Sequence, residues 1–196
     1  MVFDDTLPNI DEASFHQGDW SEFYRNAVEL KPPNAPEPRG KPVNMFCFCD
    51  TDHAGDKITR RSQTGIILFL NQAPILWYSK KQNTVESSTF GSEFVVLRIA
   101  VELIKALHYK LRMMGVPIDG PCTVFCNNEA TVKNSSIPES TLKCKHNAIT
   151  FHKVGKSVAS GITRIAYIHS SNNLADMLTK PLPRAKIHKF CEQILY

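Results

Sequence analysis

Long apolar runs are missing from this sequence, and their absence argues against a membrane protein. No stretch of about 18 consecutive apolar residues occurs, so no membrane-spanning helix is expected. The N-terminus, MVFDDTLPNIDEASF, is acidic and lacks the apolar segment that a secretory signal peptide requires. We therefore expect an intracellular protein with no membrane partner.

Cysteine pairs with zinc-site spacing are also missing. The six cysteines include no CxxC pair, whereas structural zinc sites commonly draw two ligands from such a pair. Without a secretory signal, disulfides are not expected either. The sequence therefore predicts buried or free thiols in a reducing compartment.

Charge is plentiful but unevenly distributed. The net charge is +4, yet residues 1–42 hold four Lys or Arg against eight Asp or Glu. Residues 43–196 hold nineteen Lys or Arg against eleven Asp or Glu, a balance of +8. A basic body is compatible with a polyanionic partner such as nucleic acid. Charge alone does not identify that partner.

The composition changes near residue 42, and this change predicts a boundary. Residues 31–42 contain five prolines, so they can form neither a regular helix nor a central strand. Upstream, residues 19–30 have the composition of one helical segment that caps the main body. We therefore predict an acidic N-terminal segment with a Pro-rich linker over residues 1–42 and a single folded domain over residues 43–196.

Five apolar runs within residues 43–196 predict strands. The first three are joined by connections that favour antiparallel pairing, and NQAP supplies a turn between the second and the third. The predicted strands are 43–50, 65–70, 75–79, 122–126 and 162–168.

Helical periodicity is clearest over residues 87–115, where apolar side chains recur at steps of three and four. Gly115 and Pro117 end this pattern. Its apolar face consists of Phe94, Leu97, Val101, Ile104, Leu107, Leu111 and Met114. Shorter helices are predicted at NEATVKN, over residues 145–161, at NLADMLTK and at AKIHKFCEQILY. The order of elements predicts a mixed α/β layer fold.

Several acidic side chains fall at element ends. Asp50 ends the first strand, and alternation places Asp52 on the same side. Glu93 lies near the start of the long helix, and Asp176 lies in NNLADMLTK. Each alone is compatible with a surface charge or with an acid that complements a helix dipole. Together they suggest a cluster of acids, although the turn after the fourth strand carries Asn127, an amide that does not ionise.

Five motifs then occur in an order that resembles a known family. CDTDHAGDKITRRSQTG, PILWYSKKQNTVESSTFGSEFVVL, VFCNNEATVKN, KHNAITFHKV and NNLADMLTKPLP are similar to the ribonuclease H domains of copia-type retrotransposon polyproteins. The resemblance covers roughly residues 43–196. Residues 1–42 look like the stretch that joins this domain to the preceding reverse transcriptase.

The resemblance implies a ribonuclease H-like fold, a five-stranded mixed sheet with three antiparallel strands and then two more, flanked by helices. It implies cleavage of the RNA strand of RNA–DNA hybrids with two Mg²⁺ or Mn²⁺ ions. It also implies attachment to a reverse transcriptase, a monomer when isolated, and a location in the cytoplasm, the nucleus or a virus-like particle. Its four metal-binding acids fall on Asp50, Glu93, Asn127 and Asp176.

Asn127 leaves three explanations open. It is a deliberate inactivating substitution, natural decay in a retroelement relic, or a loss that another acid compensates. Glu129 is the nearest compensating candidate and Asp52 the next, although a solvated first-turn acid explains Glu129 as well. Other departures from the family pattern are Phe90 and Ala148, which stand where many members carry acids.

Further site residues follow from the resemblance and from charge. His169 precedes Asp176 by seven residues, where some ribonucleases H place a histidine that assists product release, and an ordinary loop histidine is the alternative. The candidates for contacts with nucleic acid are Arg60, Arg61, Lys80, Lys81 and Gln82.

Three functions remain open at this stage. The first is a metal-dependent ribonuclease H, active or weakened by Asn127. The second is a catalytically inactive module that still binds RNA–DNA hybrids, because hybrid binding depends mostly on phosphate and 2′-hydroxyl contacts. The third is an integrase-like strand transferase, against which the long helix between the third and fourth strands argues.

Overall fold

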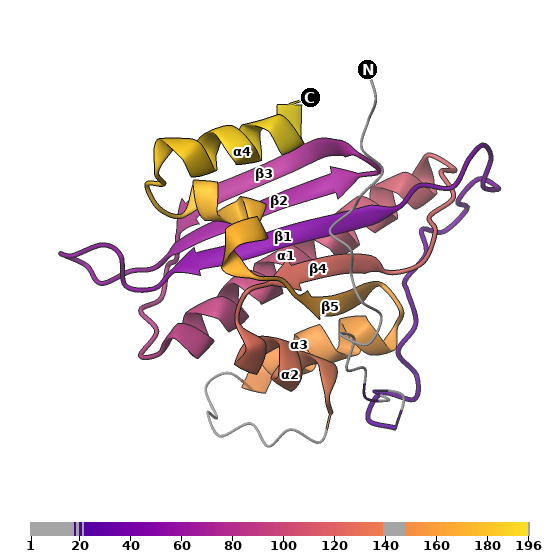
Figure 1. Cartoon of the computed structure of the whole chain (residues 1–196). Helices are drawn as coiled ribbons and strands as arrows, with labels where there is room; N and C mark the ends of the chain where they lie inside the picture. Colours follow the sequence, from indigo (N-terminus) through magenta and orange to yellow (C-terminus); the bar gives the residue numbers. More distant parts are fainter. Residues whose placement is uncertain (1–17, 19, 21, 139–147, 196) are drawn as a thin grey trace.

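A computed structural model describes residues 18, 20, 22–138 and 148–195 of the protein. These residues form one five-stranded sheet. The strand order is β3-β2-β1-β4-β5. β1, β2 and β3 pair antiparallel, whereas β4 is parallel to β1 and β5 is parallel to β4 (Figure 1). The strands are β1 (Met45–Asp52), β2 (Gln63–Leu70), β3 (Ala73–Lys81), β4 (Cys122–Cys126) and β5 (Thr163–Tyr167). The predicted mixed sheet is confirmed.

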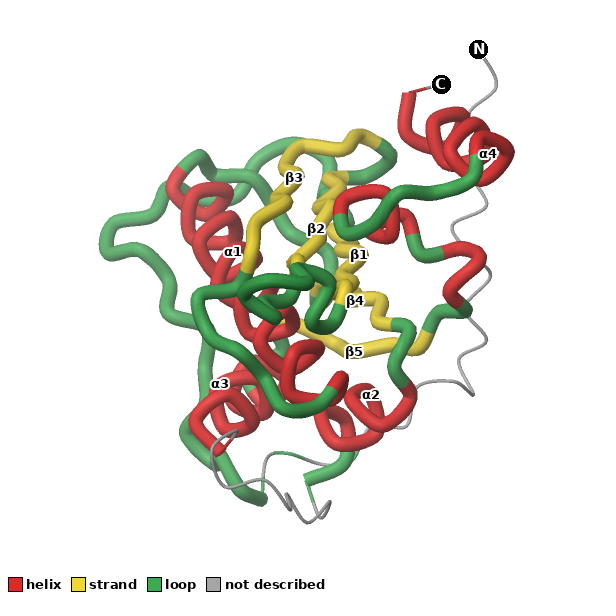
Figure 2. Tube along the Cα trace, turned by 90° about the vertical axis from the view of Figure 1, so that its left-hand side faces the viewer, coloured by secondary structure: helices red, strands yellow, loops and turns green. Residues whose placement is uncertain are grey.

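Helices cover both faces of this sheet. α1, α2 and α3 lie on one face, and α4 lies on the other (Figure 2). The helices are α1 (Thr89–Met113), α2 (Glu129–Ser136), α3 (Ala148–Ala159) and α4 (Arg184–Leu195). Two short 3₁₀ helices, η3 (Ser170–Asn172) and η4 (Leu174–Leu178), connect β5 to α4. Of the segments that the structure describes, none forms a helix long and apolar enough to cross a membrane.

Alternation along β1 divides the core between the two faces. Cys47 and Cys49 pack with α1, α2 and α3. Phe48 points the other way, into a second cluster that includes Phe125 and Phe190. Because successive strand residues face opposite sides, a strand buried on both faces reads as one continuous apolar run. The run MFCFC before Asp50 has this property.

The long helix α1 begins and ends close to its predicted limits. Ser88 caps its start by accepting a hydrogen bond from the Gly91 backbone N–H. Gly115, at φ +68°, follows its end. The predicted apolar face is buried, except that Leu107 is half-buried and Met114 is 65% exposed. Met114 is exposed because it lies beyond the last helical turn.

The prediction of a helix over residues 19–30 is wrong for the part that is described. That part forms turns, with Tyr24 N–H donating to the Trp20 carbonyl at 3.0 Å. Trp20 is 2% exposed and packs against Phe151. Gly155 of α3 makes this possible, since a Cβ there would lie 2.4 Å from the Trp20 ring. Anchoring of the aromatic ring outweighs helix propensity here.

The Pro-rich stretch, residues 31–42, forms neither a helix nor a strand, as its composition predicts. Residues 1–17, which hold the first part of the predicted acidic segment, lie outside the described residues. So do residues 139–147, which include the predicted start of the helix over residues 145–161. α3 covers the remainder of that prediction.

Candidate active site

The parallel pairing of β1 with β4 brings two of the predicted site residues together. Cys49 lies opposite Cys126 in the register of the two strands. Asp50 and Asn127 follow these two residues and therefore meet at the same edge of the sheet. The Asn127 side-chain amide donates a hydrogen bond to Asp50 Oδ1 at 3.2 Å. Asp50 is 1% exposed.

A buried asparagine, Asn173, attaches the segment that carries Asp176 to this edge. Asn173 caps η4 through its side-chain oxygen and donates its Nδ2 to the Cys49 carbonyl at 2.9 Å. This bond places Asp176, which is 1% exposed, next to Asp50. Gly65 of β2 permits the close approach of η4, because a Cβ there would lie 2.7 Å from the Ala175 carbonyl oxygen.

Glu93 completes the group from the first turns of α1. It is 3% exposed, and Cys126 Sγ donates to its Oε2 at 3.8 Å. Burial is the main cause that raises the pKa of Glu93 well above its usual range, and the Cys126 thiol and Asp50 add to the effect. We refer to Asp50, Glu93 and Asp176 as the acid cluster.

Two lysines neutralise part of this charge. Lys180 Nζ lies 3.1 Å from Asp176 Oδ1 and 3.7 Å from Asp50 Oδ2. Lys186 Nζ lies 2.6 Å from Asp176 Oδ2. The Thr179 hydroxyl also donates to Asp50 Oδ2. Our sequence analysis missed all three residues, although the four-residue spacing between Asp176 and Lys180 was a usable signal.

These contacts act in opposite directions on the two aspartates. Burial raises the pKa of Asp50, and the Thr179 hydroxyl and the Lys180 ammonium only partly offset it. Burial also acts to raise the pKa of Asp176, but hydrogen bonds from Lys186 and Lys180 outweigh it and lower the pKa. The pKa values of the two aspartates are therefore shifted in opposite directions.

A cavity of about 490 Å³, here called the acid cavity, opens beside this group, with Asp50, Glu93, Asn127, Glu129 and Lys180 in its lining. Within the described ranges, no three His, Cys, Asp or Glu side chains are arranged to hold one metal ion together. The donor set nevertheless suits a hard cation. Carboxylate oxygens are what Mg²⁺ prefers, and both Asp50 and Asp176 supply buried ones.

The two compensating candidates differ in position. Glu129 lines the acid cavity but has a side chain that is 65% exposed, and it forms an ion pair with Lys133 at 3.7 Å. Asp52 instead lines a second groove. His169 is exposed at the start of η3, and its hydrogen bonds in the structure go to Ser171. The structure therefore brings Glu129 to the acid cluster more directly than Asp52.

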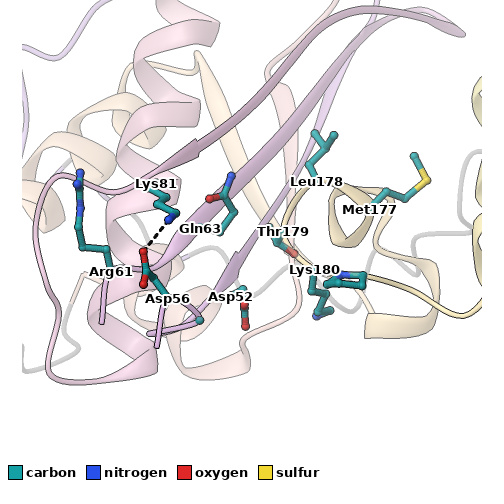
Figure 3. Close-up of a pocket in the computed structure, with 11 residues that line it drawn as sticks. Asp52, Asp56, Arg61, Gln63, Lys81, Met177, Leu178, Thr179 and Lys180 are labelled. Carbon is teal, nitrogen blue, oxygen red and sulfur yellow. Dashed lines mark hydrogen bonds and ion pairs between the residues drawn. The ribbon is translucent and has the colours of Figure 1, made fainter. Parts of the chain in front are cut away.

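The second groove has a volume of about 630 Å³, and the residues that line it are drawn in Figure 3. We refer to it as the outer groove. It is lined by Asp52, Gly55, Asp56, Arg61, Gln63, Lys81 and residues 177–181. Figure 3 shows the Lys81 ammonium paired with Asp56, at 2.6 Å. Both acidic and basic side chains line the outer groove, so it is not uniformly basic.

The five candidates for contacts with nucleic acid fall into different environments. Arg60 and Lys80 are exposed. Arg61 is tied to the loop after β3, where it donates to the Gln82 carbonyl and to Asn83 Oδ1. Gln82 is 3% exposed, and its amide donates to the Ser92 carbonyl at 3.0 Å. Gln82 thus holds the start of α1 against β3, and a contact of its side chain with nucleic acid stays a prediction.

Solved structures with this architecture define the class of the fold. The chain superimposes on LC11-RNase H1, determined in complex with an RNA/DNA hybrid, with a TM-score of 0.55 and 18% identity over 69% of this chain and 94% of that one. An N-terminal RNase H domain from Mycobacterium tuberculosis gives a TM-score of 0.53 and 10% identity over 76% of this chain and 97% of that one. The protein therefore has the ribonuclease H fold.

Sequence relatives narrow this class. The Retrovirus-related Pol polyprotein from transposon RE1 of Arabidopsis thaliana is 30% identical over 156 residues, which cover 80% of this chain and 11% of the relative. The corresponding polyprotein from transposon TNT 1-94 of Nicotiana tabacum is 27% identical over 76% of this chain and 11% of the relative. No family model matches. The homologues of this chain are Pol polyproteins of copia-type retrotransposons, and the chain spans about a tenth of their length.

Proposed function

We propose that this chain is the ribonuclease H domain of a retrotransposon Pol polyprotein, and that it hydrolyses the RNA strand of RNA–DNA hybrids with activity weakened by Asn127. The observation that carries the proposal is the convergence of Asp50, Glu93 and Asp176 at one edge of a ribonuclease H fold. Buried acids with shifted pKa values that surround a cavity are typical of catalytic sites.

The chemistry explains the need for these acids. Hydrolysis of a phosphodiester adds charge to an anionic phosphate, and divalent ions supply Lewis acidity and lower the pKa of the attacking water. Asp50, Glu93 and Asp176, together with the amide oxygen of Asn127, would hold the two Mg²⁺ or Mn²⁺ ions.

Asn127 weakens this arrangement in two ways. Its amide oxygen is neutral, and its Nδ2 is engaged as a donor to Asp50 Oδ1. If the missing carboxylate supplied ~3–6 kcal/mol of stabilisation, the rate falls by ~10²–10⁴-fold or more. Glu129, on the lining of the acid cavity, is our candidate for the compensating acid.

The remaining roles belong to the same proposal. The domain covers residues 43–196, residues 1–42 form the connection to a reverse transcriptase, and His169 assists product release. Arg60, Lys80 and Lys81 are the exposed basic candidates for contacts with the phosphates of the hybrid.

The deciding experiment is cleavage of an end-labelled RNA–DNA hybrid by the chain and by Asn127→Asp, with Mg²⁺ and then Mn²⁺. We expect Asn127→Asp to cleave ~10²–10⁴-fold faster, because it restores a charged ligand. Asn128→Asp is the matched control, since Asn128 is the neighbouring amide and serves as the N-cap of α2. Failure of both the chain and Asn127→Asp to cut with either ion would contradict the proposal.

A second candidate function is a hybrid-binding module without catalysis. The observation that favours it is that Asn127, Thr179 and Lys180 already engage both oxygens of Asp50. Binding of the uncleaved hybrid with a Kd that is the same for the chain and for Asn127→Asp, together with cleavage only by the latter, would support this function. If the chain itself cuts, Glu129→Gln tests whether Glu129 compensates.

A further inference from the structure

Lys180 occupies an unusual position for a surface lysine. It follows η4, four residues after Asp176, and its ammonium lies between Asp176 Oδ1 at 3.1 Å and Asp50 Oδ2 at 3.7 Å. Both carboxylates are about 99% removed from solvent, with side chains 1% and 2% exposed. An ammonium that bridges two buried carboxylates stands where a shared metal ion would bind.

The surroundings of this ammonium carry more negative than positive charge. Asp50, Asp176 and Asp52 all act to raise the pKa of Lys180, against the opposing effect of burial, which is the largest single contribution. Glu93 also interacts electrostatically with Lys180. Within the part of the chain that the structure describes, the other cation that pairs with the cluster is Lys186. A doubly charged ion would gain more from such a site than a single ammonium does.

Lys180 and Lys186 are held differently. Lys186 donates to Asp176 Oδ2 at 2.6 Å and to the Ser170 carbonyl at 3.0 Å, and its Nζ lies 5.2 Å from the centre of the Phe190 ring. The Lys180 side chain is 38% exposed and lines both the acid cavity and the outer groove. Figure 3 shows Lys180 beside Thr179 on the side of the outer groove that η4 forms. Lys180 therefore has space into which its ammonium can move.

We propose that Lys180 is an internal counter-ion whose ammonium takes the place of a divalent cation between Asp50 and Asp176 and has to leave when such a cation binds. The inference rests on the proposed function, because it assumes that these two aspartates hold the ion. Lys180 thereby sets the affinity of the site for the metal ion. Lys180 stabilises the metal-free protein and moves into the outer groove, near Asp52, in the metal-bound one.

The direct test is titration calorimetry with MgCl₂ and with MnCl₂, without nucleic acid, on the chain and on Lys180→Met. We expect Lys180→Met to bind the ion about tenfold more tightly, because a competing charge a few ångströms away has been removed. Lys81→Met is the matched control, since Lys81 also lines the outer groove but pairs with Asp56. It should leave the Kd unchanged.

A second measurement separates competition from a general effect of charge or folding. Without metal, Lys180→Met should have a lower Tm than the chain, and added MgCl₂ should raise its Tm by more. Lys180→Arg keeps the charge and should restore the metal-free Tm. An unchanged or weaker affinity in Lys180→Met, an equal gain in Lys81→Met, or no metal binding by any of these proteins overturns the inference.

Failure of this inference is distinguishable from failure of the proposed function. Cleavage by Asn127→Asp tests the function and does not depend on the Kd of Lys180→Met. Cleavage combined with an unchanged Kd would retain the nuclease and remove Lys180 from metal binding. Tighter binding without cleavage would retain Lys180 as the counter-ion and remove the nuclease.

Discussion

Two regions of this protein bury carboxylates beside cations, and they do so with different charge balances. In the first, Glu29 lies against α1, where it accepts from Arg112 at 3.0 Å and contacts His108 at 3.0 Å. Burial acts to raise the pKa of Glu29, but Arg112 and His108 outweigh it and lower the pKa. Burial is the main cause that lowers the pKa of His108. One carboxylate thus faces a guanidinium and an imidazole.

The acid cluster is not balanced in this way. Among the described residues, the cations that pair with Asp50 and Asp176 are Lys180 and Lys186, and the pKa values of Asp50 and Glu93 are raised. A balanced group such as that of Glu29 attaches the N-terminal stretch to α1 and is a structural device. An excess of buried acid is costly for stability unless a further cation binds. The Glu29 group is therefore a structural ion pair, whereas the acid cluster carries an excess of buried acid.

The largest expected effect comes from breaking the acid cluster at its centre. In the Asn127→Asp protein, Asp50→Asn should reduce hybrid cleavage by about 10³-fold or more, since it removes a shared charged ligand. Single-turnover cleavage with Mg²⁺ measures the change. Retention of more than about a tenth of the rate would mean that Asp50 is not a metal ligand.

A smaller effect is expected at the same site when Glu93 is changed, and it is a gain in stability and not a loss of activity. Glu93→Gln should raise the free energy of unfolding of the metal-free chain at pH 7 by about 1–3 kcal/mol, because burial opposes ionisation of the Glu93 carboxyl and Gln has no group to ionise. The pKa of Glu93 is raised in the folded state. Its stabilising contribution is therefore present below the unfolded pKa of about 4.5 and is lost as the pH rises through the folded pKa.

Urea unfolding at a series of pH values from 4.5 to neutral tests this prediction. The chain should lose stability over that rise in pH, and Glu93→Gln should lose less. Glu129→Gln is the control, since Glu129 is exposed on the same cavity. Parallel curves of stability against pH for the chain and for Glu93→Gln would contradict a raised pKa of Glu93 in the folded state.

The smallest expected effect belongs to the balanced region. Glu29→Gln should lower the free energy of unfolding at pH 7 by about 1–2 kcal/mol, because Arg112 and His108 lose a half-buried partner. The lowered pKa of Glu29 means that its contribution is present above the unfolded pKa of about 4.5 and is lost as the pH falls through the folded pKa. Cleavage by Asn127→Asp should be unchanged when Glu29→Gln is added.

Much of the fold could be predicted from periodicity. The strand over residues 122–126 has its predicted limits, and the long helix differs by two residues at each end. These elements are buried on defined faces, so their sequence patterns are strong. The turns over residues 22–30 could not be predicted, because their conformation depends on where the Trp20 ring packs.

The site could be predicted only in part. Asp50, Glu93, Asn127 and Asp176 came from a family resemblance, and their roles as ligands stay predictions. Gln82 illustrates the limit. A polar residue after two lysines reads as exposed, yet its amide bridges β3 and the start of α1 inside the protein.

The sequence by itself determined the order of strands and helices, the acids at their ends and the absence of a carboxylate at position 127. Periodicity and residue identity are local properties, so they can be read without coordinates. Only the tertiary structure decided that Lys180 lies between Asp50 and Asp176, and that Asn173 ties η4 to β1. The contacts of Lys180 with Asp50 and of Asn173 with Cys49 join residues more than a hundred positions apart, and they depend on how a short 3₁₀ helix packs against the sheet.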